Sequence, residues 1–341
     1  MKNAKPVFGT FTGHPSRLDI RGVQSPYSTL PLPLWITNLR IKSRLSVFFN
    51  LGPYIGCVDF FDAKIFGFSD VCFWNKETKQ RFVYRSVMGP RKRFVPHNLN
   101  IGFTANYKKH RYARISWDRN RGMLSLIFNL KGNRVRPSSN GALIADTSSE
   151  EASELTLVMP SPIVRRCSAH YMQSVPLHGA ITLDSNGDIQ TMNDSDGQAF
   201  FDMSRTYMKF HTKGEFLTGL GSVNGKQLVF RLQVSTQDAI ERDRYNANAM
   251  FYGGDVTALP PVVITHPYGM MNTWFIQDTE GMVDLSFTPV SDNPNVISAF
   301  VLRSEYHTMY GTFEGTLVTG SGEKISFKSL AGITKKYMIR L

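Results

Sequence analysis

Two residues of this sequence, Asp202 and His307, are candidates for proton transfer. The ordinary pKa of histidine lies nearest to neutrality, and a shielded carboxylate can serve as an acid or a base. His307 precedes Tyr310 by three positions, and strand alternation directs two such side chains to opposite faces. His307 is therefore either a catalytic residue or, more commonly for a histidine, a hydrogen-bonded residue of a core or rim.

Asp202 belongs to the segment "DMSRT", which also contains Arg205. If the two side chains are buried together, they form a charge-assisted contact that orients a ligand or a neighbouring loop. The alternative, and the more common arrangement, is a structural ion pair at a strand end. Both residues are candidates for the site, Asp202 as a catalytic residue and Arg205 as a ligand-binding residue.

Several kinds of site are excluded by the motifs that the sequence lacks. The eight histidines show no HxH or HExxH spacing, so we expect no metal site. No GxSxG, P-loop or GxGxxG motif lies in a strand-to-helix context, which argues against nucleophile-elbow hydrolases and nucleotide enzymes. We therefore expect no cofactor.

The three cysteines are an odd number without CxxC spacing, which argues against a disulfide framework and favours a reducing compartment. The first residues are basic but lack the apolar core of a secretory signal, and the most apolar region is too interrupted to span a bilayer. These features predict a soluble, cytoplasmic protein.

Four tryptophans could stack on a hydrophobic ligand within a β structure, although each could equally be a packing residue. They are Trp35, Trp74, Trp117 and Trp274. Of these, Trp35, Trp117 and Trp274 are candidates for ligand binding, together with Tyr310.

The dominant pattern is short runs of β-branched and aromatic residues separated by turn residues, which predicts hairpins. Residues 215–234 contain the strongest such signal, the Asn224–Gly225 pair. In residues 307–332 the side chains are expected to alternate between two faces on both sides of a turn, with Ile325, Phe327 and Ser329 on one face. Residues 235–251 are the best candidate for a helix. Two further hairpins are expected at 111–130 and 178–192.

The fold class predicted from these strands is all-β, a sandwich or barrel with few short helices. A chain of 341 residues with 24 Phe and 13 Tyr can form a large core, and its length favours two domains. The polar run at residues 136–154 is the expected boundary, because the basic character of the chain ends there. This gives an N-terminal β domain over 1–150 and a C-terminal β domain over 151–341.

The positive charge lies in the first part of the chain. Residues 1–140 hold 24 Lys and Arg against 6 Asp and Glu, and residues 141–341 hold 15 against 21. Residues 89–98 and 107–122 mix basic with aromatic side chains. Such segments form a solvated rim, contact an anionic membrane surface, or receive the anionic end of a lipid at a barrel mouth. Nucleic acid is a less favoured partner.

Several stretches in order resemble a known family. The segment 200–212, "FFDMSRTYMKFHT", is followed by "NAMFYGGDVTALPPV" at 248–262, then by 283–289 and 307–333. Residues 33–62 and 160–183 add the opening and central parts of the pattern. This order is similar to bacterial proteins that carry the domain of unknown function 2804.

The resemblance implies a β-rich fold. More loosely, it places the chain near the lipocalin-like carotenoid hydratases and certain pericyclases, with two lipocalin-like antiparallel barrel or sandwich halves packed together. Family members carry a Glu-Asn pair where this chain has Ala247 and Asn248, so Asn248 is a candidate ligand-binding residue. A C-terminal Gly-x-x-Glu pattern is also replaced, at residues 332–335. The loss of two acidic groups argues against acid–base chemistry inherited from the family.

Three functional hypotheses remain open. The first is a binding protein for a hydrophobic or amphipathic anionic small molecule, such as a lipid or an isoprenoid. The second is a cofactor-independent hydratase, isomerase or cyclase on the same scaffold, with Asp202 or His307 as acid or base. The third is an interaction module that uses the basic N-terminal surface. A convergent acid–base pair inside a cavity would distinguish the second hypothesis from the others.

Overall fold

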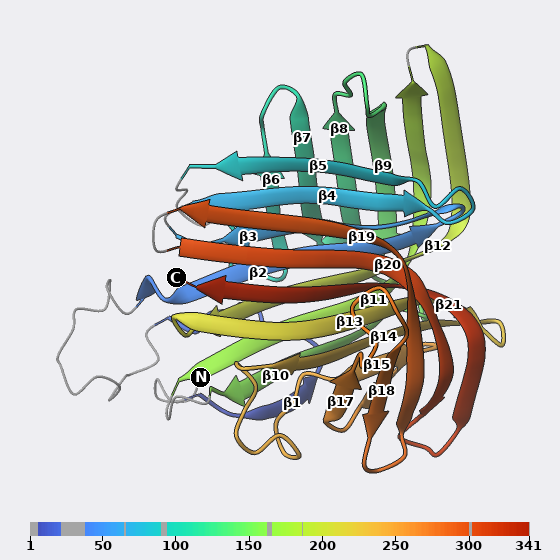
Figure 1. The fold of residues 1–341 in the computed structure, drawn as a ribbon. Coiled ribbons are helices and arrows are strands. Elements are labelled where there is room, and N and C mark those ends of the chain that lie inside the picture. Colours follow the sequence, from blue (N-terminus) through green and yellow to red (C-terminus); the bar gives the residue numbers. More distant parts are fainter. Residues whose placement is uncertain are drawn as a thin grey trace.

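The chain forms two large antiparallel sheets that pack face to face (Figure 1). The computed structural model describes residues 6–21, 38–64, 66–89, 94–161, 166–185, 187–299 and 302–340. Twelve strands build the first sheet, which runs in the order β5-β4-β3-β2-β12-β11-β9-β8-β7-β6, with β10 and β1 added at β11. Its strands are β1 (Gly9–Thr12), β2 (Ile41–Leu51), β3 (Tyr54–Asp62), β4 (Gly67–Asn75), β5 (Arg81–Met88), β6 (Ile101–Asn106), β7 (Arg111–Asp118), β8 (Met123–Leu130), β9 (Ser138–Asp146), β10 (Ser153–Pro160), β11 (Cys167–Ser185) and β12 (Asp188–Tyr207).

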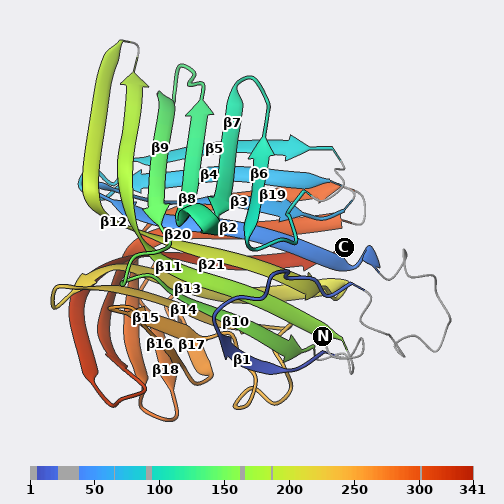
Figure 2. The ribbon, with the colours of Figure 1, turned by 180° about the vertical axis from the view of Figure 1, so that it is seen from behind.

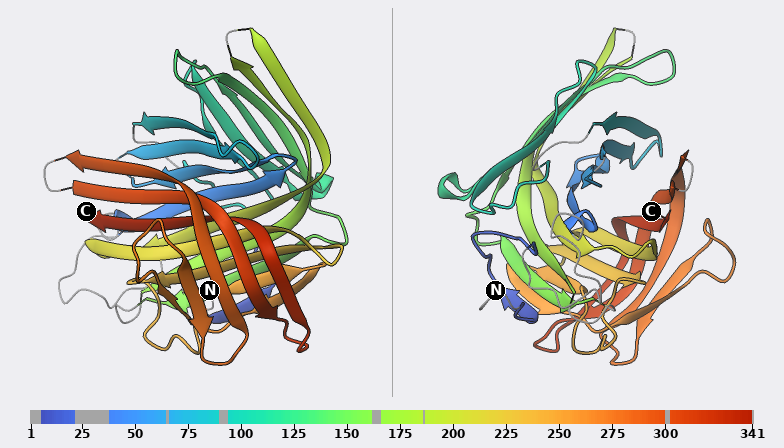
Figure 3. Two further views of the ribbon diagram at one scale, coloured as in Figure 1. Left: turned by 45° about the vertical axis from the view of Figure 1, so that its right-hand side comes forward. Right: turned by 90° about the vertical axis from the view of Figure 1, so that its left-hand side faces the viewer.

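The second sheet has nine strands in the order β16-β15-β14-β13-β21-β20-β19-β18-β17. Because β17 returns to contact β14, this sheet nearly closes, and we call it the C-terminal barrel. The first sheet is more open, and we call it the N-terminal half-barrel (Figure 3). The strands of the C-terminal barrel are β13 (His211–Val223), β14 (Lys226–Ser235), β15 (Ala249–Tyr252), β16 (Asp255–Ala258), β17 (Val262–Thr265), β18 (Trp274–Asp278), β19 (Val283–Ala299), β20 (Leu302–Val318) and β21 (Lys324–Arg340).

The all-β prediction and the predicted hairpins are confirmed. The hairpin β13–β14 turns at Asn224 and Gly225, whose φ angles of 53° and 76° are both left-handed, and Val223 pairs with Lys226 across the turn. Two central residues with positive φ suit the right-handed twist of the flanking strands, and asparagine and glycine adopt that conformation at the lowest cost. Here the local sequence sets the turn.

The final hairpin, β20–β21, follows the predicted alternation only in part. Ile325 is fully buried and Phe327 half-buried, but Ser329 is exposed and Leu330 is buried in its place. The register shifts here, because Phe313 pairs with Leu330 while Gly315 pairs with Phe327. This bulge inserts one extra residue into β21, and an extra residue reverses the faces of the strand beyond it. The prediction for Ser329 was wrong for that reason.

The helix predicted over 235–251 is absent, and the segment forms successive turns. Asp238 terminates the preceding strand, since its carboxylate accepts hydrogen bonds from the Ser235 amide at 2.6 Å and the Gln233 side chain at 2.7 Å. Aspartate side chains compete in this way with helix formation. The element η1 (Arg119–Arg121) is a single 3-10 turn. Within the described ranges, no helix is long and apolar enough to cross a membrane.

Three apolar clusters hold the fold together. One fills the N-terminal half-barrel with aromatic rings such as Phe73 and Phe82, whose centroids are 4.9 Å apart. A second fills the C-terminal barrel around Trp274. The third lies between the two sheets and joins Trp74 to Tyr310, with ring centroids 5.9 Å apart. We call this interface the seam. Burial of each large apolar side chain contributes ~1.5–3 kcal/mol, so the seam makes the two sheets one packed unit.

The chain changes from one sheet to the other between Tyr207 and His211. Residue 150, near which the sequence predicts a boundary, lies within the N-terminal half-barrel, because β10, β11 and β12 complete that sheet. Figure 2 shows these strands from behind, with β11 paired to β10 and to β12. The division of the chain into folding units at residue 150 stays a prediction.

Candidate functional site

A pocket of about 470 Å³ opens at one end of the C-terminal barrel. Its apolar wall includes Val234, Met270 and Met338, and its polar wall includes Lys213, Arg242 and Glu305. Pockets that bind small molecules combine such a wall with a few polar groups, in volumes of roughly 300–1,000 Å³. We call this the mouth pocket.

Three neighbouring strands bring ionisable side chains together in the mouth pocket. Lys336 of β21 lies directly opposite Glu215 of β13 on one side and His307 of β20 on the other. Residues directly opposite in an antiparallel sheet project from the same face. Glu215, Lys336 and His307 therefore form one row across the inner wall, and all three line the pocket.

Glu215 and Lys336 share a third partner, His266. The Lys336 Nζ lies 2.8 Å from Glu215 Oε1, and His266 Nε2 lies 3.0 Å from each of these atoms. A neutral His266 accepts a hydrogen bond from Lys336, whereas a protonated His266 donates one to Glu215. The His266 ring also packs on Trp274, with centroids 4.7 Å apart. Glu215, Lys336 and His266 therefore form one hydrogen-bonded cluster beside Trp274.

His307 is held by an acid that the sequence did not point to. Its Nδ1 donates a hydrogen bond to Asp292 Oδ2 over 2.7 Å, and its Nε2 lies 3.7 Å from Glu305 Oε1. A carboxylate that accepts from Nδ1 fixes the imidazole tautomer and leaves Nε2 as the basic nitrogen. His307 thus lines the mouth pocket and is held from behind by Asp292.

Asp202 lies in the seam, not in the mouth pocket. Its Oδ2 accepts a hydrogen bond from Arg231 Nε over 3.0 Å, and its Oδ1 has no hydrogen-bond partner among the described residues. His170 lies on the same wall, and burial, followed by the charge of Arg231, lowers its pKa to about 4. The cavity beside them is only about 70 Å³, which suits ordered water rather than an amphipathic ligand.

A second carboxylate of the seam, Asp59, holds basic residues from both sheets. It accepts hydrogen bonds from Arg44 at 2.9 Å and from Lys335 of β21. Burial opposes ionisation of Asp59, but Lys335 and Arg44 together hold its pKa well below the usual range. The polar part of the seam is therefore an inter-sheet ion network.

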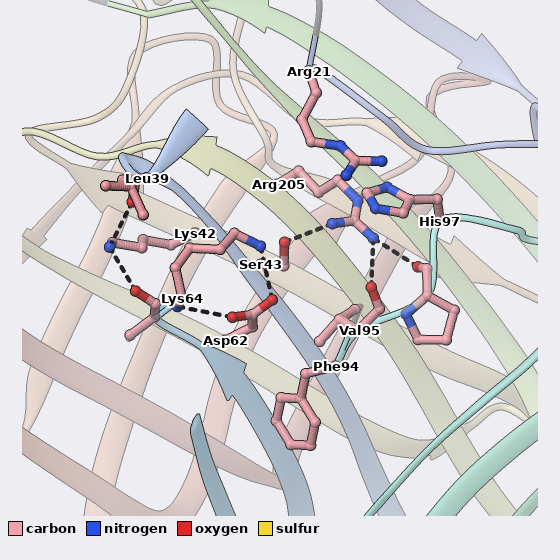
Figure 4. A network of polar contacts seen from close by, with 12 residues as sticks. Arg21, Leu39, Lys42, Ser43, Asp62, Lys64, Phe94, Val95, His97 and Arg205 are labelled. Atoms are coloured by element: carbon pink, nitrogen blue, oxygen red, sulfur yellow. Dashed lines mark hydrogen bonds and ion pairs between the residues drawn. The ribbon is translucent and has the colours of Figure 1, made fainter. Parts of the chain in front are cut away.

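Arg205 does not contact Asp202. The two residues are three apart on β12, so strand alternation places them on opposite faces of the sheet. Arg205 is buried in the half-barrel, where it donates to the Leu18 carbonyl at 2.6 Å and to Ser43 Oγ at 2.6 Å. It also donates to the carbonyls of Val95 and Pro96 (Figure 4). The predicted pair is not formed, and Arg205 instead anchors two loops across the end of the half-barrel.

The other predicted ligand-binding residues are distributed over the fold. Trp117 packs in the core of the half-barrel, and Trp274 in that of the C-terminal barrel. Tyr310 lies in the seam, on the face opposite to Met309 and the barrel interior. Asn248 accepts from the Gln233 amide and donates to the Pro260 carbonyl, both over 2.8 Å. Trp35 lies outside the described residues.

His307 is thus the predicted site residue that lines the mouth pocket. Sequence reasoning missed Asp292, His266, Glu215 and Lys336, because none of them belongs to a local motif. The alternation of β21 was a signal that Lys336 shares a face with Met338, but the partner strands could not be read from it. In the described part of the chain, no group of three or more His, Cys, Asp or Glu side chains is placed to hold a metal ion.

A family model described as a domain of unknown function (DUF2804) matches residues 47–341. This confirms the resemblance found in the sequence. A search of curated proteins gave no sequence match.

Among solved structures, CghA with Sch210972 is 12% identical, with a TM-score of 0.52 over 97% of this chain and 98% of that chain. An AttH candidate from Nitrosomonas europaea is 11% identical, with a TM-score of 0.54 over 92% and 98%. Kievitone hydratase from Nectria haematococca is 11% identical, with a TM-score of 0.49 over 88% of both chains. The first two likenesses establish a shared two-sheet fold.

Proposed function

We propose that this chain, which belongs to the DUF2804 family, binds a small amphipathic molecule in the mouth pocket. The observation that carries the proposal is the row of Glu215, Lys336 and His307 on one wall of a pocket of about 470 Å³ that also has an apolar wall. The polar end of the ligand meets this row. Its apolar part contacts Met270, Met338 and the interior of the barrel.

An anionic or carbonyl-containing head group suits the polar row best. Lys336 donates to Glu215 and His266, and its third N–H remains for a ligand oxygen. Lys213 and Arg242 add positive charge at the rim. A fatty acid or an oxygenated isoprenoid has this combination of polar head and apolar body.

The proposal is tested by native mass spectrometry of freshly purified protein, followed by solvent extraction and a thermal-shift panel of fatty acids and isoprenoids. We expect a bound species or a stabilising shift. Met270→Arg places a charge in the pocket wall and should abolish the shift. Met271→Arg is the matched control, because Met271 is the next residue, is half exposed and does not line the pocket. Equal binding by both variants would place the ligand elsewhere.

A second candidate function, cofactor-independent proton transfer, is favoured by the hydrogen bond between Asp292 and His307. His307 Nε2 would accept a proton from carbon, the resulting imidazolium would be stabilised by Asp292, and Lys336 would stabilise negative charge on a substrate oxygen. Return of the proton to another carbon of the same molecule shifts a double bond and gives an isomer. The test is deuterium incorporation into compounds of the same panel in D₂O, read by mass spectrometry.

A further inference from the structure

The outer face of β6, β7, β8 and β9 is unusually poor in charge for a sheet surface. Figure 2 looks onto this face, and no other described strand covers it. Phe103 is 50% exposed, Ile101 55%, and Ile127 and Ile144 39% each. These side chains point away from the core that fills the half-barrel.

Strand register shows that these residues form one continuous surface. Phe103 pairs with Ser116, which pairs with Ser125, which in turn pairs with Ile144. The next row contains Arg114, Ile127 and Ala142. Arg114 lies over the Phe103 ring, with the guanidinium carbon 5.1 Å from the ring centroid. Apart from Arg114, the outward positions in these two rows are apolar or hydroxyl-bearing. A surface depleted in charge and rich in apolar groups is typical of the centre of a protein interface.

The two ends of this face carry opposite charge. The loops after β6 and β8 form the basic end, where Lys109, Lys131 and Arg134 are exposed. Their side chains form no ion pair among the described residues. At the opposite end of the strands, Asp118 and Asp146 flank Met123 on the face itself. Asp118 pairs there with the exposed Arg121 of η1.

We propose that a second copy of this chain packs on the outer face of β6–β9. The two-fold axis between the copies lies in the interface and is perpendicular to the strands. This axis places the basic end of each copy beside the acidic end of its partner. The apolar rows then face each other at the centre, as an isologous interface requires. The proposal is independent of the mouth pocket, which lies in the other sheet.

The size of the face suits a stable dimer. With strands ~4.8 Å apart and ~3.3 Å per residue, β6–β9 together with residues 177–184 of β11 and 188–194 of β12 cover roughly 750 Å² per copy. Roughly 1,500 Å² in total falls within the range of specific protein interfaces. An anionic membrane is disfavoured as the occupant, because the β11–β12 hairpin beside this face adds Asp184 and Asp188 at the basic end.

The test is analytical ultracentrifugation of the full chain over a range of micromolar concentrations. We expect a dimer that weakens as salt increases, because the end charges are screened. Ile127→Arg, at the centre of the face, should give a monomer with an unchanged circular dichroism spectrum. Val263→Arg on β17, where Val263 is 62% exposed, is the control and should remain dimeric.

Ile144→Lys is a second disrupting variant, for use if Ile127→Arg fails to fold. A monomeric wild type at every concentration would overturn the proposal, as would a dimer that both face variants leave intact. Co-sedimentation of a monomeric wild type with phosphatidylglycerol vesicles, lost in Ile127→Arg, would assign the face to a membrane instead.

Discussion

His307 Nδ1 and Asp292 Oδ2 lie 2.7 Å apart, on neighbouring strands at the wall of the mouth pocket. Asp292 Oδ1 is buried and has no hydrogen-bond partner among the described residues. The carboxylate therefore directs its one hydrogen bond to the imidazole. A carboxylate–imidazole pair of this geometry can act as a general base.

Asp292→Asn should remove base activity while ligand binding is retained. An amide at position 292 can donate to His307 Nδ1, which would move the proton to Nε2 and leave no basic nitrogen facing the pocket. Where deuterium incorporation is detected, we expect its rate to fall on the order of 10²–10⁴-fold, as for the loss of a general base. His307→Gln should have the same effect. Unchanged incorporation in both variants would exclude His307 as the base.

Arg231→Met should be one of the most destabilising single substitutions in the seam. It leaves the buried Asp202 carboxylate without its ionic partner, and removal of one member of a buried pair costs ~3–5 kcal/mol. The double variant Arg231→Met with Asp202→Leu should recover much of that loss. Urea denaturation measures the free energy of unfolding of each variant. A double variant less stable than Arg231→Met would contradict this account.

His170 should make the protein less stable in mild acid. Its pKa is lowered to about 4 in the folded state, chiefly by burial, against an ordinary value of 6.5. The unfolded chain therefore binds a proton that the folded protein resists, so stability is retained above pH 6.5 and lost as pH falls towards 4. The contribution is on the order of 3 kcal/mol at most.

Asp70 has the opposite effect on the pH dependence of stability. Burial raises its pKa to about 6, so as the pH falls the folded protein binds a proton at Asp70 before the unfolded chain does. The role of His170 is isolated by comparing His170→Gln with the wild type in urea denaturation at several pH values. The variant should lose less stability between pH 6.5 and 4. If the free energy of unfolding falls equally with pH in the two proteins, His170 does not contribute to the acid sensitivity.

Gly315→Ala should destabilise the final hairpin at its bulge. Gly315 has a φ of +130°, and a Cβ there would lie 2.1 Å from the Asp284 carbonyl oxygen. Backbone strain alone costs ~1–3 kcal/mol, and the clash adds to it. Gly322→Ala is the matched control, because Gly322 also has positive φ, at +87°, but has open space around it. Thermal unfolding should show the larger loss for Gly315→Ala.

The hairpins could be predicted from the sequence because their signals are local. The Asn224–Gly225 turn and the alternation in β20 and β21 depend on residues within a few positions of each other. The predicted helix over 235–251 failed because Asp238 forms hydrogen bonds within its own turn, which no periodicity reveals.

The sequence by itself determined an all-β chain and its main turns, and it predicted His307 as a candidate site residue. Only the tertiary structure decided which side chains meet His307. Glu215 and Lys336 are more than a hundred residues apart, and they meet because β13 pairs with β21 in one register. A shift of one residue would turn either side chain to the seam, and that register is set by the bulges and the packed cores of the whole sheet.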